Sequence, residues 1–66
     1  MVTLEEAIKG GEELVREERK EADNLLNKGF NDLAKMKSVQ ADNHEQLTEW
    51  LKELMAYRLA EASVTD

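Results

Sequence analysis

The residue of this chain with the most versatile chemistry near neutral pH is His44, its single histidine. Carboxylates stand close to it in the sequence, at Asp42 and Glu45. A metal or catalytic site on helices would need a second histidine or a glutamate three residues earlier, and position 41 is alanine. We therefore expect His44 to be a solvent-exposed residue near a helix start that can modulate association, and not a ligand or a catalytic base.

Other catalytic arrangements are also missing from the sequence. It contains no cysteine, no nucleophile–base pair, no evident carboxylate dyad and no glycine-rich loop after a strand. A helical bundle of this size has little room for a sequestered pocket. We predict that the protein is not an enzyme, with no catalytic residue, no cofactor and no metal.

Acidic residues crowd the segment from residue 12 to residue 23, where Arg16, Arg19 and Lys20 interrupt them. One interpretation is a solvated helix face laced with ion pairs. The other is an inhibitor that mimics nucleic-acid phosphates. The net charge of −6 itself opposes binding to nucleic acid, whose affinity comes mainly from clustered lysine and arginine.

A small basic island consists of Lys28, Lys35 and Lys37. It is interpreted either as solvated surface or as a site for a phosphate-bearing molecule. The second interpretation predicts a ligand- or nucleic-acid-binding helical bundle, which is the alternative function considered for this chain.

Two aromatic residues, Trp50 and Tyr57, lie seven positions apart with Leu54 between them. Tryptophan and tyrosine are enriched at interface hot spots, so this flank is predicted to bind a partner rather than pack within one chain. Arg58 falls near the middle of the same apolar arc and is expected either to reach solvent or to pair with Glu18. The predicted partner or oligomer interface comprises Trp50, Leu54, Tyr57, Leu47, Leu51, Arg58 and Gly29.

The elements that carry these residues are predicted to be helices, since strong helix formers predominate and there is no proline. Thr3 and Glu6 form a capping-box pattern, and apolar residues stay in helical phase from Leu4 to Met36. This predicts a long first helix over about 4–37 that passes through Gly29. A short separate N-terminal turn before Gly10-Gly11 is the variant left open.

The second half of the chain begins with a polar stretch that predicts a loop over about 38–42, followed by a helix over about 43–63. The apolar arc of this helix spans about 200°, wider than one neighbouring helix covers. A chain of 66 residues without disulfides also has a marginal core. We expect one all-α domain over 1–66, an antiparallel two-helix hairpin that assembles as a homo-oligomeric bundle, as a dimer.

The function that fits these features best is protein–protein interaction, by a small acidic regulator or inhibitor of a partner protein of unknown identity. A purely structural oligomerisation module is a third interpretation. The N-terminus lacks the basic segment of a signal peptide, and no stretch approaches the roughly 20 apolar residues of a membrane span. We expect a cytoplasmic protein with no membrane partner.

Overall fold

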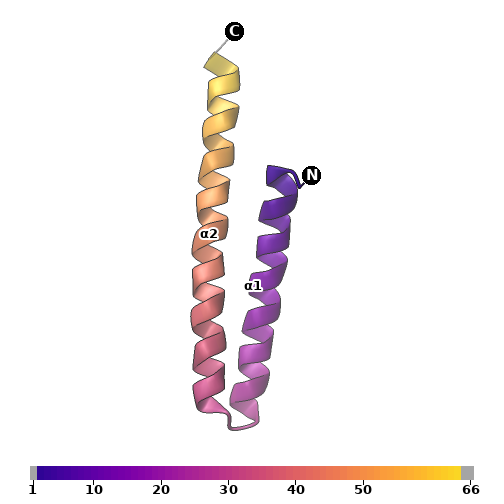
Figure 1. Cartoon of the computed structure of the whole chain (residues 1–66), viewed down its shortest axis with the longest axis vertical. Helices are drawn as coiled ribbons and strands as arrows, with labels where there is room; N and C mark the ends of the chain where they lie inside the picture. The colour runs from indigo at the N-terminus through magenta and orange to yellow at the C-terminus, as the bar shows by residue number, and fades with distance from the viewer. Residues whose placement is uncertain (1, 65–66) are drawn as a thin grey trace.

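The computed structural model describes residues 2–64, with side chains described through residue 62. It is an antiparallel hairpin of two helices, α1 (Leu4–Asn27) and α2 (Asn31–Val64), which lie side by side along most of α1 (Figure 1). The hairpin measures 57 × 18 × 15 Å. The prediction of an all-α hairpin is confirmed over these residues, while the predicted helix boundaries are not.

The start of α1 is capped as the sequence predicts. The Glu6 N–H donates a hydrogen bond of 3.1 Å to the Thr3 hydroxyl oxygen, which satisfies one free donor of the first turn. The helix then passes through Gly10 and Gly11 without a break, so a separate N-terminal turn does not form. Gly11 is half-buried against α2, and its lack of a side chain is what lets α2 approach there.

The end of α1 corrects the prediction of a helix running to residue 37. Gly29 has a φ of +87°, and the Phe30 and Gly29 N–H groups donate to the carbonyls of Leu25 and Leu26, at 2.9 and 3.0 Å. This pairing is the Schellman motif, which ends a helix with glycine in the left-handed region. The prediction that Gly29 lies inside a helix is therefore wrong.

The prediction of a loop over residues 38–42 is also wrong, because α2 is continuous from Asn31 to Val64. The apolar pattern lapses there for a reason other than a turn. Within this stretch the contact with α1 is made by Ala41, which is buried, and by Ser38, which is half-buried; Ala34, one heptad before Ala41, is buried too. Alanine is the best helix former, and its small side chain permits a close helix–helix approach.

The two helices meet along a line that we call the inner seam. Its residues alternate at spacings of three and four along each helix, the pattern of a left-handed coiled coil, and all are buried or half-buried. On α1 they are Leu4, Ile8, Gly11, Val15, Glu18, Ala22 and Leu25; on α2 they are Ala34, Lys37, Ala41, His44, Thr48, Leu51 and Met55.

The helices differ in length, with 24 residues in α1 and 34 in α2. At about 1.5 Å per residue the difference is roughly 15 Å, so the C-terminal part of α2 extends past the start of α1 (Figure 1). Within residues 2–64, neither helix carries an apolar stretch long enough to cross a membrane.

The turn provides a direct stability test. Replacing Gly29 with alanine is expected to lower the free energy of unfolding by about 1 kcal/mol, because alanine is strained at positive φ. The matched control is Gly10→Ala, which should stabilise by up to about 1 kcal/mol, since Gly10 is exposed within α1 and a Cβ there meets no atom within 4 Å. Urea unfolding monitored by circular dichroism measures both, and stabilisation by both substitutions would contradict the turn at Gly29.

Candidate functional site

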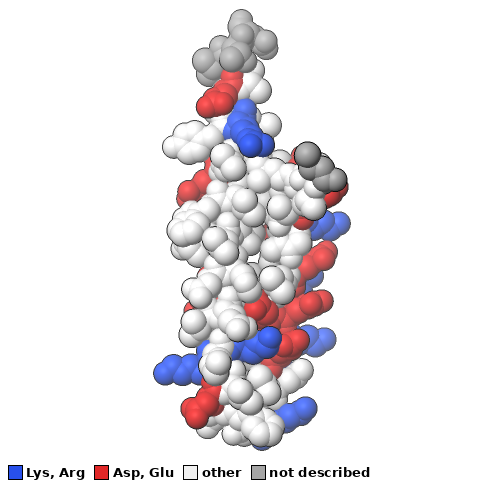
Figure 2. All heavy atoms as spheres, viewed as in Figure 1, with Lys and Arg blue, Asp and Glu red and all other residues white. Residues whose placement is uncertain are grey.

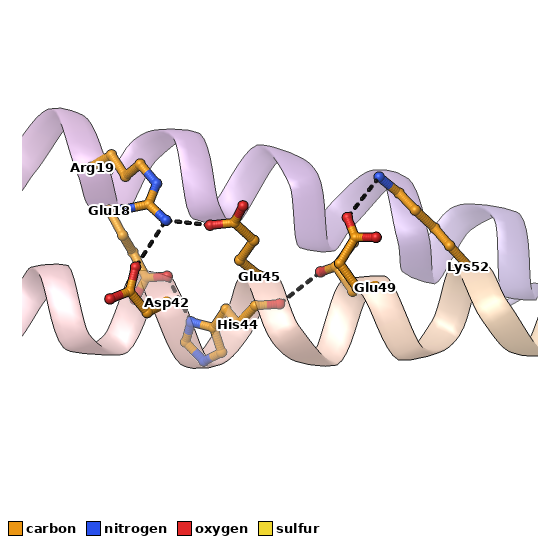
Figure 3. Close-up of polar contacts among 8 residues, drawn as sticks. Glu18, Arg19, Asp42, His44, Glu45, Glu49 and Lys52 are labelled. Carbon is orange, nitrogen blue, oxygen red and sulfur yellow. Dashed lines mark hydrogen bonds and ion pairs between the residues drawn. The ribbon is translucent and has the colours of Figure 1, made fainter.

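One flank of the hairpin is occupied by ion pairs between α1 and α2. The Arg19 guanidinium contacts Asp42 at 3.0 Å and also Glu45, and the Lys52 ammonium lies 3.4 Å from Glu49 (Figure 3). Lys52 is also 3.4 Å from Glu12. The hydrogen bonds of Arg19 to Asp42 and then Glu45 raise its pKa. We call this surface the ion-pair flank.

The pKa of Lys52 is raised too, first by its hydrogen bond to Glu12. Both cations are solvent-exposed, so each pair contributes little to stability. A groove of about 230 Å³ on this flank is lined by both signs of charge, with Arg16 and Lys52 facing Glu12, Glu45 and Glu49. The lining is therefore mixed in charge, with three carboxylates and two cations.

The sequence predicts a solvent-exposed His44. In the structure this side chain is instead engaged with a residue of α1. His44 Nδ1 lies 2.6 Å from Glu18 Oε1 (Figure 3). The Thr48 hydroxyl donates to the His44 carbonyl oxygen at 2.8 Å. The Glu18 side chain is only 7% exposed, against 37% for His44. An ionised carboxylate can only accept, so His44 Nδ1 carries the hydrogen of this bond when Glu18 is charged.

This pair is the feature that sequence reasoning missed. From the sequence, Glu18 was considered only as a possible partner of Arg58, yet its carboxylate is engaged by His44. The sequence signal for it was the position of Glu18 in a three-four repeat with Val15, Ala22 and Leu25.

Over the described residues, no cluster of three His, Cys, Asp or Glu side chains is arranged to hold a metal ion.

The three lysines of the predicted basic island do not form one patch. Lys28 is the C-cap of α1, whereas Lys35 and Lys37 lie on α2 about 200° apart around the helix. The Lys37 ammonium is also 3.1 Å from a Glu21 carboxylate oxygen. The turn at residues 28–30 has separated Lys28 from Lys35, which a single long helix would have placed on one side two turns apart.

A second three-four repeat runs along α2, about 100° around the helix from the inner seam. We call it the outer seam. Its residues are Leu33, Met36, Gln40, Asn43, Leu47, Trp50, Leu54 and Tyr57, and every one of them is exposed. Figure 2 shows uncharged surface over much of α2, while most charged side chains in that view gather along the outer edge of α1 and towards the turn.

The structure divides the residues predicted as an interface. Leu47, Trp50, Leu54 and Tyr57 belong to the outer seam and lie on one side of α2. The remaining three do not share that surface. Leu51 is half-buried on the inner seam, Arg58 is exposed beyond Met55, the last inner-seam residue of α2, and Gly29 is in the turn.

Comparison with known proteins finds no matching protein-family model, no similar curated protein and no similar solved structure.

Proposed function

We propose that this chain is a small, acidic, non-enzymatic helical protein that acts by binding another protein, as a regulator or inhibitor of that partner. The outer seam of α2 is the proposed working surface. The observation that carries the proposal is a coiled-coil repeat whose large apolar residues stay exposed, among them Trp50 at 56%, Leu54 at 43% and Tyr57 at 71%.

Single exposed apolar residues are normal on protein surfaces and need no explanation. A repeat of them at helical spacing is different, because amphipathic helices bind grooves and other helices through anchors at such spacing. Leu33, Leu47 and Leu54 share one side of α2 with Trp50 next to them, so they present a continuous ridge. This arrangement supports protein binding over solvation as the role of the outer seam.

The alternative function, binding of a nucleotide or nucleic acid through Lys28, Lys35 and Lys37, receives less support. Those lysines lie apart, one is paired with a carboxylate, and the chain carries a net charge of −6. Nucleic-acid binding that relies on phosphate contacts weakens steeply with salt. Binding of this chain to labelled oligonucleotide, lost on raising salt, would favour that alternative.

Affinity capture tests the proposal. The tagged chain is incubated with a lysate of its native host, and captured proteins are identified by mass spectrometry for the original sequence, for Trp50→Ala and for Leu26→Ala. Leu26 is the matched control because it is 57% exposed, against 56% for Trp50, and lies on α1 away from the outer seam.

The expected result is a specific protein retained by the original sequence and by Leu26→Ala and lost with Trp50→Ala. Truncation of a hot-spot aromatic commonly costs about 2 kcal/mol or more, roughly thirtyfold in affinity. Equal retention by the two variants would remove the outer seam from the proposed function.

A further inference from the structure

We infer that the outer seam of α2 pairs with the outer seam of a second copy of this chain, so that two hairpins form a four-helix assembly with the α2 helices at its centre. This inference rests on the outer seam being a protein-binding surface, as proposed above, and takes a second copy of this chain as the protein that occupies it. Three features of the molecule support a second copy over an unrelated occupant.

The first feature is the amount of exposed surface. The hairpin exposes 5482 Å², whereas a compact monomer of its mass exposes about 4,300 Å². The excess of roughly 1,200 Å² exceeds the approximately 800 Å² that each partner buries in a typical stable complex. A copy of the chain therefore has enough exposed surface to form a dimer, and the exposed residues include the ridge of Leu33, Leu47, Trp50 and Leu54.

The second feature is the pair of amides in the outer seam. Gln40 and Asn43 interrupt a repeat that is otherwise apolar, with Leu33 and Met36 on one side and Leu47 and Trp50 on the other. A fully apolar partner helix would leave these amides buried without hydrogen bonds, which is costly. A second copy whose α2 runs parallel to the first brings the same amides to the same layers, where each can donate and accept, as buried asparagines do when they set the register of coiled coils.

The third feature is the distribution of charge. The chain carries −6, so two copies repel each other wherever their acidic surfaces meet. None of the outer-seam residues is charged. The acidic side chains at Glu12, Glu45 and Glu49 lie instead on the ion-pair flank, where Arg19 and Lys52 compensate them. Pairing through the outer seam thus brings uncharged seam residues together, with Asp32, Lys35 and Glu53 at the edge of the contact beside Met36 and Tyr57.

Sedimentation equilibrium from about 1 to 100 μM tests the inference on the full chain, with helicity checked by circular dichroism. The variants are Leu47→Lys in the outer seam and Leu26→Lys as the matched control. Both replace an exposed leucine and change the net charge equally, but Leu26 lies on α1. A third variant, Asn43→Leu, replaces one of the two seam amides.

We expect the original sequence and Leu26→Lys to be dimeric, Leu47→Lys to dissociate with at least a tenfold larger constant, and Asn43→Leu to associate more tightly or with higher stoichiometry. A monomeric original sequence at 100 μM would overturn the inference, as would equal weakening by the two lysine variants. If the chain is monomeric while affinity capture still depends on Trp50, the proposed function stands and only the second copy is excluded.

Discussion

Replacing Ala41 with leucine is expected to lower the free energy of unfolding by about 3 kcal/mol, because overpacking of a close helix contact forces the helices apart. Ala41 is 0% exposed and lies on the inner seam, between Ala34 and Thr48, which are also buried. A domain of this size has only a small total stability, so the loss would unfold a large share of the molecules at moderate temperature.

The control for this substitution is Ala56→Leu, the same change at an exposed position of the same helix. Its effect should stay within about 0.5 kcal/mol. Urea unfolding of both variants is compared at one protein concentration, because self-association makes apparent stability depend on concentration. If Ala41→Leu were as stable as Ala56→Leu, the helices could not be in close contact at this layer.

Replacing Glu18 with alanine is the second change expected to be severe, with a loss of about 2 kcal/mol. It removes the carboxylate that accepts from His44 and leaves space on the inner seam where the Glu18 side chain was buried. Glu17→Ala is the matched control, since it deletes an exposed carboxylate of the same helix and should change stability little.

A double-mutant cycle separates the pair from the packing. If Glu18 and His44 stabilise each other, Glu18→Ala and His44→Ala together should cost less than the sum of the single losses. Replacing both residues with leucine should restore the stability of the original sequence or exceed it, since replacing both partners of a hydrogen bond with apolar groups is often neutral or stabilising. Equal stability of Glu18→Ala and Glu17→Ala would show that the contact contributes nothing.

Residues of the inner and outer seams of α2 differ in what they contact. The inner seam uses small residues such as Ala34, Ala41 and Thr48 to hold the hairpin closed, so the larger residues Leu47, Trp50 and Leu54 are not needed for that contact. This division explains why the apolar arc of the second half of the chain is too wide for one neighbour. It also predicts that changes on the outer seam alter association while leaving helicity intact.

Local interactions determined what could be read from the sequence alone. The helical class follows from residue propensities, and the cap at Thr3 follows from a side chain bonding to a backbone group three residues away. The flank with Trp50, Leu54 and Tyr57 followed from helical spacing within one element. Each of these depends on neighbours along the chain, so no knowledge of the other helix was required.

The place of the turn was decided only by the tertiary structure. The apolar pattern resumes in phase after Gly29, so periodicity alone could not distinguish a continuing helix from a hairpin turn. The polar stretch over residues 38–42 was predicted as a loop although it is helical. Its contact with α1 is made by Ala41, whose small side chain contributes little to a hydrophobic pattern. What identifies Ala41 as a seam residue is the close approach of α1.

The pairing of residues far apart in sequence depends on that turn. Glu18 meets His44, and Arg19 meets Asp42, only because the chain reverses at residues 28–30. A reversal some ten residues later would oppose a different set of residues and leave Glu18 without its partner. Propensity and periodicity describe each helix separately. The register between α1 and α2 depends on the contact between them, which buries the small residues of the inner seam and pairs the buried carboxylate of Glu18.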